Sequence, residues 1–447
     1  MTRTIDIKAL IDERRISGFQ WLLVVLCFLI VMTDGMDVAI MGFVTPSILK
    51  AWSISRPAFG VVISAAPLGL VLGALFAGPS SDRFGRKIVL IVSVFAFAVL
   101  TIAAAFSTTP IEMAVLRLLA GTGLGAAMPN TTTLLSEYAP QRRRALMITI
   151  MFTGFNLGSA LIGLAAGYMI PRFGWRSVLM LGGAIPLALI PVLVLLLPES
   201  ARFLALRGAS PARIAATLGR VLGVHYEDTV SFVSSEPALG TQKPIGVLFL
   251  RGYARITLAL WLTNGMGLLV IYLLTGWLPT LMGDAGVSVA TAAYVTSMFQ
   301  LGGTIGAVCV GWVMDRIARP GIVIGLVYLA GAGCILTLAH AGALASTIAS
   351  LVFAAGFCMS GAQTGLQAFS PSCYPTVARA TGVSWMLAIG RFGSIFGSAI
   401  GGVLLGMGWG FSAILSLLAA PAVCAAITIA ANTRGRAQTP EPHTIAH

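Results

Sequence analysis

Long apolar stretches are the feature that most limits what this chain can fold into. Twelve of them are long enough for a helix to cross the roughly 30 Å hydrocarbon core of a bilayer. Only 10% of the 447 residues are charged, against about 25% in an ordinary soluble domain. The composition therefore excludes a water-soluble globule and predicts an all-α membrane protein with twelve transmembrane helices. The expected spans are 19–45, 57–79, 88–106, 110–136, 144–170, 175–197, 252–282, 289–314, 321–340, 343–370, 378–405 and 410–432.

The spans form two similar sets of six. The segment Gly78 to Arg86, after the second span, resembles the segment Gly311 to Arg319, after the eighth. A second match at nearly the same offset pairs Arg144-Ala145 and Gly158-Ser159 with Arg379-Ala380 and Gly393-Ser394. Two matches at nearly one offset indicate an internal repeat. We therefore predict two pseudo-symmetric six-helix bundles around a central cavity, the architecture of a secondary transporter.

Composition along the chain sets the domain boundaries. Residues 1–197 form the first predicted bundle, and 251–447 form the second bundle with a polar tail. The stretch 198–250 is much more polar and is interpreted as a cytoplasmic connector. Within it, Ser210-Pro211 is a typical N-cap and first-turn pair, which predicts a short amphipathic helix ending near Leu222.

The basic residues predict the orientation of the chain. If both termini are cytoplasmic, most of the 28 Lys and Arg residues fall in cytoplasmic loops, and those outside are Lys50, Arg56, Arg172 and Arg176. This bias satisfies the positive-inside rule. The net charge of +13 comes from residues between apolar spans rather than from a basic face on a soluble module. The expected partner is therefore the lipid bilayer, and not nucleic acid.

Four charged residues lie deep within spans: Asp34, Asp37, Arg117 and Arg391. A charge at the bilayer centre costs about 2.5 to 3.5 kcal/mol on the insertion scale, so such residues are usually functional. Asp34 and Asp37 are three residues apart, which places both carboxylates on one helix face. Two close carboxylates near an arginine can titrate near neutral pH, so the pair is a candidate for proton coupling. The structural alternative is a buried ion pair between either aspartate and Arg117.

The two deep arginines favour an organic anion as the transported substrate. A guanidinium stays charged in the membrane and offers a planar fork that matches a carboxylate. Arg117 and Arg391 are therefore candidate substrate-binding residues, with a purely structural interhelical role as the alternative. Polar and aromatic side chains within the spans complete the predicted substrate site: Asn156, Gln300, Gln363 and Trp277. For these, ordinary packing is the competing interpretation.

The loop after the second span is a candidate gate at the cytoplasmic edge. Its predicted gating residues are Gly78, Asp82, Arg83, Gly85 and Arg86, with Asp315 and Arg316 as equivalents in the second half. Asp82 could cap a helix N-terminus or pair with Arg86 across the turn. The alternative is a basic loop that only sets topology. The six cysteines show no metal-ligand spacing, so no metal site is expected.

Several of these motifs resemble a known family. The segment from Gly78 through Asp82-Arg83 to Gly85-Arg86-Lys87 resembles the signature loop of the major facilitator superfamily. Asp34-Gly35-Met36-Asp37 is similar to the D-G-x-D motif of its aromatic acid:proton symporters. The similarity continues through Leu134 to Tyr138, Pro198 to Leu204, Trp277 to Met282, and Tyr374 to Gly393.

The resemblance implies proton symport of an aromatic carboxylate, such as 4-hydroxybenzoate or protocatechuate, by alternating access across the bacterial inner membrane. It places Asp34 and Asp37 in coupling, Asp82 in the gate, and Arg379 in a charged network with Arg117 and Arg391. We expect a monomer that needs the proton gradient but no cofactor. Another cargo, such as a sugar, a different organic acid or a drug, is the alternative. An enzyme is not expected, because no nucleophile is paired with a base.

Overall fold

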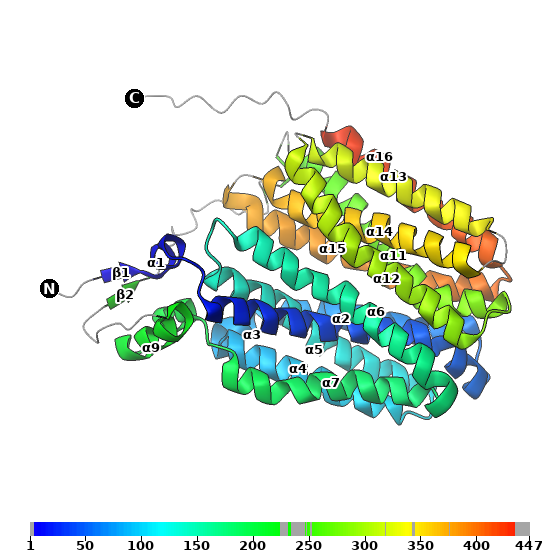
Figure 1. Ribbon diagram of the computed structural model, residues 1–447, viewed down its shortest axis with the longest axis horizontal. Coiled ribbons are helices and arrows are strands. Elements are labelled where there is room, and N and C mark those ends of the chain that lie inside the picture. Colours follow the sequence, from blue (N-terminus) through cyan, green and yellow to red (C-terminus); the bar gives the residue numbers. More distant parts are fainter. Residues whose placement is uncertain are drawn as a thin grey trace. The chain divides into compact units, whose positions relative to one another are not determined.

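The computed structural model describes residues 4–223, 231–233, 246, 248–250, 253–317, 319–341, 345–374 and 376–433. Within these residues, twelve helices are long and apolar enough to cross a membrane, which confirms the predicted all-α membrane fold (Figure 1). They are α2 (Gly18–Trp52), α3 (Arg56–Phe84), α4 (Arg86–Ala105), α5 (Pro110–Tyr138), α6 (Arg144–Phe173), α7 (Trp175–Leu196), α11 (Ala254–Asp284), α12 (Val289–Arg316), α13 (Pro320–Ala339), α14 (Ala345–Phe369), α15 (Thr376–Gly406) and α16 (Phe411–Thr433).

Local sequence signals explain where these helices begin and turn. Ser17 and Gln20 form a capping box at the start of α2, since each side chain bonds the other residue's backbone N–H. Thr109 caps α5, which has Pro110 in its first turn. The α3–α4 turn passes through Gly85 at φ +95°, a conformation that favours glycine because it has no Cβ.

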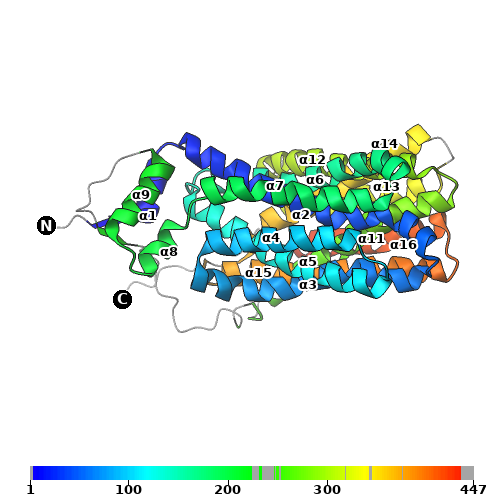
Figure 2. The same ribbon diagram turned by 90° about the horizontal axis from the view of Figure 1, so that it is seen from below.

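The connector and the N-terminus add short elements. Helix α9 (Pro211–Leu222), with Ser210 as its N-cap, confirms the predicted connector helix. Helices α1 (Ile7–Glu13) and α8 (Ala201–Leu206) and the parallel strands β1 (Thr4–Asp6) and β2 (Ser231–Val233) were not predicted. Strands of three residues are too short to produce a recognisable alternation. Figure 2 shows α1, α8 and α9 gathered at one end of the N-terminal helices.

Contacts divide the chain into two compact units. Unit 1 comprises Met1–Ala238, Thr275–Ser297 and Ser398–Gly408, and unit 2 comprises Leu239–Leu274, Met298–Gly397 and Trp409–His447. These units differ from the predicted division at 197 and 251. The last turns of α11, the first turns of α12 and the end of α15 pack with the N-terminal helices. The functional division of the chain into 1–197, 198–250 and 251–447 stays a prediction.

Close approach of backbones through glycine explains this packing within unit 1. A Cβ at Gly42 of α2 would lie 1.9 Å from the carbonyl oxygen of Thr275, and one at Gly402 of α15 would lie 2.6 Å from that of Arg56. A Cβ at Gly69 of α3 would lie 2.1 Å from the carbonyl oxygen of Leu118 in α5. Small residues at such crossings are typical of membrane helices, where lipid gives no hydrophobic drive for association.

Gly69→Ala tests this packing. The added methyl group must displace backbone rather than a flexible side chain, and overpacking of this kind costs about 1 to 3 kcal/mol. We expect a lower unfolding temperature for the purified protein in detergent. Gly333→Ala is the matched control, because a Cβ at that helical position meets nothing within 4 Å. It should be neutral or slightly stabilising through helix propensity. Equal stability of the two variants would contradict the close-packing argument.

Candidate functional site

The centre of unit 1 contains a fully buried ion pair between α2 and α5. Arg117 Nη1 donates to Asp37 Oδ1 at 2.7 Å, and Nη2 donates to Oδ2 at 2.9 Å. Nη2 also donates to the Asp37 carbonyl oxygen at 3.0 Å. Both side chains have 0% exposure. This is the bidentate geometry that makes arginine and carboxylate a strong pair.

A hydroxyl from a third helix completes this cluster. Thr101 of α4 donates from Oγ1 to Asp37 Oδ1 at 2.6 Å, and it is also fully buried. Arg117 Nε has no hydrogen-bond partner among the described residues. The pair is neutral overall, which lowers the cost of burying two charges in low dielectric. Loss of the Asp37 charge would leave the arginine charge uncompensated, so each partner of the pair depends on the other.

Asp34 lies one turn earlier on α2 and is 3% exposed. Arg117 forms its bidentate ion pair with Asp37, so the structure distinguishes the two aspartates that the sequence left equivalent. Between them, Gly35 packs against α6, where a Cβ would lie 1.9 Å from the Phe155 carbonyl oxygen. Ser159 of α6 donates to the Gly35 carbonyl oxygen at 2.7 Å. The aspartate pair is therefore held at a close helix crossing.

Unit 2 contains the other deep arginine. Arg391 of α15 is half-buried, and its Nη1 donates to the Tyr272 hydroxyl of α11 at 3.2 Å. Tyr272 is 6% exposed. A guanidinium beside a phenolic hydroxyl can bind a carboxylate and offer a second hydrogen bond. The sequence predicted Arg391 as a site residue.

Gln363 belongs to a buried polar network in unit 2. Its Oε1 accepts from Tyr328 Oη at 2.6 Å, and its Nε2 donates to Asn264 Oδ1 at 2.6 Å. Asn264 Nδ2 in turn donates to the Met386 carbonyl oxygen at 2.8 Å. These bonds tie α11, α13, α14 and α15 together. Gln363 thus has a structural role in this structure, and its predicted contact with substrate stays a prediction.

The other predicted substrate residues occupy different surroundings. Trp277 lies in unit 1 with 0% exposure, and its indole N–H donates to the Ser398 carbonyl oxygen at 2.8 Å. Gln300 of α12 belongs to unit 2 and is 2% exposed. Asn156 of α6 is half-buried in unit 1. Their predicted roles in substrate binding stay predictions.

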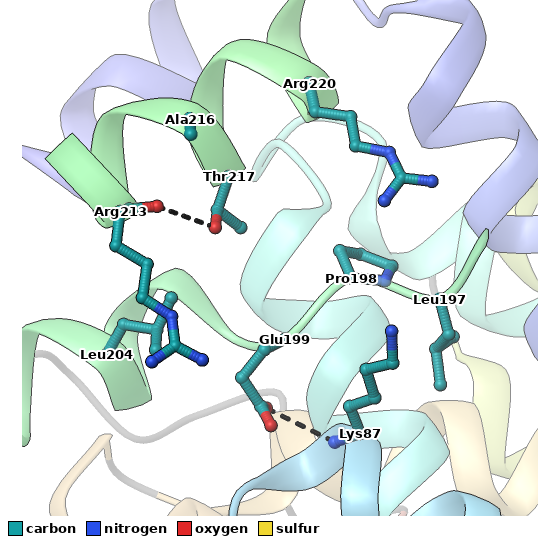
Figure 3. Close-up of a pocket in the computed structure, with 9 residues that line it drawn as sticks. All are labelled: Lys87, Leu197, Pro198, Glu199, Leu204, Arg213, Ala216, Thr217 and Arg220. Atoms are coloured by element: carbon teal, nitrogen blue, oxygen red, sulfur yellow. Dashed lines mark hydrogen bonds between the residues drawn. The ribbon is translucent and has the colours of Figure 1, made fainter. Parts of the chain in front are cut away.

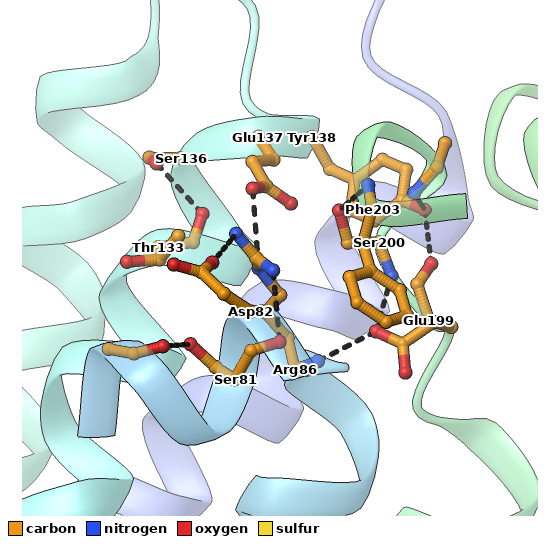
Figure 4. A network of polar contacts seen from close by, with 12 residues as sticks. Ser81, Asp82, Arg86, Thr133, Ser136, Glu137, Tyr138, Glu199, Ser200 and Phe203 are labelled. Atoms are coloured by element: carbon orange, nitrogen blue, oxygen red, sulfur yellow. Dashed lines mark hydrogen bonds and ion pairs between the residues drawn. The ribbon is translucent and has the colours of Figure 1, made fainter. Parts of the chain in front are cut away.

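The α3–α4 turn is a second polar cluster of unit 1, shown in Figure 4. Arg86 Nη2 lies 3.1 Å from Asp82 Oδ1, and Nη1 donates to the Ser81 carbonyl oxygen at 3.1 Å. Arg86 Nε lies 3.6 Å from Glu137 Oε1, an ion pair too long for a hydrogen bond. Of the two roles considered for Asp82, the structure therefore has the pairing with Arg86.

Glu199, from the segment after α7, caps α4 in place of Asp82. Its Oε1 accepts backbone N–H groups of Arg86 at 2.9 Å, Lys87 at 3.3 Å and Ser200 at 2.8 Å. A carboxylate at a helix N-terminus satisfies N–H groups that have no partner within the helix. A Cβ at Gly85 would lie 2.3 Å from Glu199 Oε2, so this glycine also makes room for the cap.

The remaining predicted gating residues are more exposed. Gly78 and Arg83 are exposed, and the Arg83 guanidinium lies over the Phe84 ring at 5.2 Å. Arg316 of α12 stacks over Trp312 at 3.6 Å. The side chains of Asp315 and Arg379 lie outside the described part of the chain. The gating role of all these residues stays a prediction.

Sequence reasoning assigned no role to several residues that build these clusters. Thr101, Glu137 and Glu199 are the main ones. Glu137 and Glu199 are acids at the ends of apolar spans, where a charge needs a partner, so their positions carried a usable signal. Thr101 carried none, because threonine in a membrane helix often bonds its own backbone. Within the described residues, no group of three or more His, Cys, Asp or Glu side chains could hold a metal ion.

Twelve membrane-crossing helices with buried charge clusters define a polytopic transport protein, and comparisons with known proteins agree. The family model of the Major Facilitator Superfamily matches residues 26–281 and 260–445. A gallate transporter of Pseudomonas putida is 55% identical over 97% of this chain and 96% of its own length. A 4-hydroxybenzoate transporter of Pseudomonas aeruginosa is 46% identical over 95% of each chain.

Solved structures give the same fold. The inward-open structure of the xylose transporter from E. coli has a TM-score of 0.69 at 18% identity, over 91% of this chain and 95% of that one. The chain belongs to the major facilitator superfamily, and it is a transporter rather than an enzyme. Within that superfamily, its close relatives are aromatic acid transporters, as the resemblance predicted.

Asp37→Asn tests whether the buried pair acts as one unit. The variant leaves the Arg117 charge buried without its counterion, which costs about 3 to 5 kcal/mol. We expect a marked fall in unfolding temperature in detergent, and a partial recovery in the double variant Asp37→Asn/Arg117→Met, which buries no charge there.

Asp82→Asn is the control, because the Asp82 side chain is 72% exposed, so its pair with Arg86 is open to solvent on that side. Such pairs are worth about 0 to 1 kcal/mol. If the unfolding temperature of the double variant fell below that of Asp37→Asn, or if Asp82→Asn lowered it as much as Asp37→Asn, Asp37 and Arg117 would not be energetically coupled.

Proposed function

We propose that this protein imports a hydroxylated benzoate together with protons across the bacterial inner membrane. The single observation that carries the proposal is the fully buried pair of Asp37 and Arg117, a titratable carboxylate held by a fixed cation. Relatives named for gallate and for 4-hydroxybenzoate support the choice of cargo. Both compounds are benzoates with at least one ring hydroxyl, so we infer the class rather than one member.

Proton coupling follows from the chemistry of the pair. Protonation of Asp37 would neutralise one partner and free two N–H donors of Arg117 for another acceptor. Asp34, buried one turn away, is the second carboxylate of the proposed coupling site. A carboxylate that exchanges a proton as its surroundings change is a common feature of membrane proton relays. In this proposal, alternating access exposes these aspartates to each side in turn.

Substrate binding is proposed to rest on the arginines. Arg391 would hold the carboxylate, with Tyr272 supporting its guanidinium, since these two side chains already contact each other. Arg117 would become a second anion-binding group once Asp37 is protonated. Asn156, Gln300, Gln363 and Trp277 are proposed to complete the site for the ring and its hydroxyl groups.

The gate and the topology belong to the same proposal. The Asp82–Arg86 pair and its surroundings would stabilise one conformation of the transporter, so Asp82 would influence the rate of exchange rather than affinity. Gly78, Arg83, Gly85, Asp315, Arg316 and Arg379 are proposed to act with it. Both termini would face the cytoplasm, the unit of function would be a monomer, and the proton gradient would replace any cofactor.

Uptake into proteoliposomes tests the function. With an imposed proton gradient, we expect uphill accumulation of radiolabelled 4-hydroxybenzoate that a protonophore abolishes. Unlabelled gallate and protocatechuate should compete, whereas xylose and shikimate should not. Asp34→Asn should abolish uphill accumulation, because it removes a titratable group without breaking the Asp37–Arg117 pair. Accumulation that is unchanged by the protonophore would exclude proton symport. Absence of competition by gallate and protocatechuate would indicate another cargo.

Arg391→Lys tests the proposed carboxylate anchor. Lysine keeps the charge but loses the planar fork, and a lost charged hydrogen bond is worth about 1.5 to 3 kcal/mol. We expect KM for 4-hydroxybenzoate to rise at least about tenfold, and Arg391→Ala to eliminate measurable uptake. Arg172→Lys, an exposed arginine at the end of α6, is the control and should behave as wild type. An unchanged KM in Arg391→Lys would make Arg391 a structural residue.

A further inference from the structure

A pocket of about 330 Å³ lies beside the Glu199 cap, at the end of unit 1 where α4 begins and α7 ends (Figure 3). Its walls come from α4, the segment after α7, α8 and the connector helix α9. They are lined by Lys87, Leu197, Pro198, Glu199, Leu204, Arg213, Ala216, Thr217 and Arg220. Three of these residues are basic and one is acidic, so the pocket carries net positive charge.

The acidic residue is already committed to the protein. Glu199 Oε1 accepts backbone N–H groups of Arg86, Lys87 and Ser200. Two of the basic residues are positioned by helix α7, since Lys87 Nζ donates to the Val194 carbonyl oxygen at 2.7 Å and Arg220 Nη2 donates to that of Leu195 at 2.9 Å. Each of these cations retains further N–H donors.

Arg213 differs from the other two basic residues. It is exposed on α9, and its guanidinium makes no hydrogen bond or ion pair within the described part of the chain. Figure 3 shows Arg213 and Arg220 extending from α9 toward the side of the pocket where Lys87 and Glu199 lie. Cations that converge from different elements on one concavity form an anion-binding site, and a guanidinium fork suits phosphate oxygens in particular.

The exposed apolar residues next to the lining residues along the chain indicate the kind of anion. Ile88 follows Lys87 on α4 and is 54% exposed, while Val194 and Leu195 of α7 are 47% and 70% exposed. These apolar side chains lie at the ends of membrane-crossing helices, beside the groups that position Lys87 and Arg220. A ligand that joins a phosphate to an apolar chain would match both the basic pocket and these exposed apolar residues at the helix ends.

We propose that this pocket binds the phosphate of an acidic phospholipid head group, with Arg213 as its main contact and Lys87 and Arg220 beside it. The volume is in the range of small-molecule sites, which hold about 300 to 1,000 Å³. The pocket is separate from the proposed transport site, because Lys87 and Thr101 are about 20 Å apart along α4 at 1.5 Å per residue. Inorganic phosphate shares the same chemistry, so the test must separate the two sources.

Native mass spectrometry of the purified full-length protein in detergent tests the proposal. The probes are dioleoyl phosphatidylglycerol, phosphatidylcholine with the same chains, and inorganic phosphate. We expect phosphatidylglycerol to bind more tightly than phosphatidylcholine. Arg213→Gln should weaken the binding of phosphatidylglycerol about tenfold, because it removes one charged hydrogen-bonding group. Because Arg213 is exposed and unpaired within the described chain, the variant should fold, which gel filtration checks.

Arg143→Gln is the matched control, since Arg143 is also exposed and lies in the α5–α6 turn, outside the pocket. It should bind phosphatidylglycerol like wild type. Equal binding of the two lipids, or an equal loss in Arg213→Gln and Arg143→Gln, would overturn the site. Displacement of phosphatidylglycerol by millimolar inorganic phosphate would retain the phosphate contact but overturn the assignment to lipid. None of these outcomes depends on transport activity, so they are independent of the proposed function.

Discussion

The fold depends on one constraint, that a charge inside a bilayer must have a partner close at hand. In unit 1 this constraint produces a three-helix cluster, in which Asp37 from α2 receives donors from Arg117 of α5 and Thr101 of α4. Three helices meet at one neutral group, so their rotation about their own axes is fixed there. The same group is the only place in this cluster where one added proton changes the charge. The atoms that order these helices are therefore the same atoms that the proposed proton coupling would use.

The ends of helices also carry charge that needs a partner. The last carbonyl groups of a helix carry partial negative charge and have no partner within the helix. Arg207, directly after α8, donates to the carbonyl oxygens of Asp82 and Arg83 at the end of α3, while Lys87 and Arg220 donate to carbonyl oxygens at the end of α7. At the start of α4, the Glu199 carboxylate instead accepts backbone N–H groups. These four charged residues at this end of unit 1 thus provide hydrogen-bond partners for backbone groups at the helix ends.

Sequence reasoning predicted the helices well because length and apolar composition decide them in a membrane. It also placed Asp37 and Arg117 among the deep charges, since burial of charge is visible in an apolar run. It could not choose between Asp34 and Asp37 as the partner of Arg117, because residues three apart share a face and only the packing of α5 decides. The boundaries of the compact units were harder still to predict from the sequence, since the close approach of Gly42 to Thr275 depends on a pair far apart in the chain.

The division of labour among arginines follows from how many of their donors the protein itself uses. Both terminal nitrogens of Arg117 donate to Asp37, and the Arg86 guanidinium contacts Ser81, Asp82 and Glu137. The Arg213 guanidinium makes no hydrogen bond or ion pair within the described part of the chain. A buried arginine whose terminal nitrogens are paired can bind a new acceptor only when a partner is removed or changes charge, whereas an exposed one can bind an anion directly. The first kind suits coupling to protons, and the second suits a site for an external ligand.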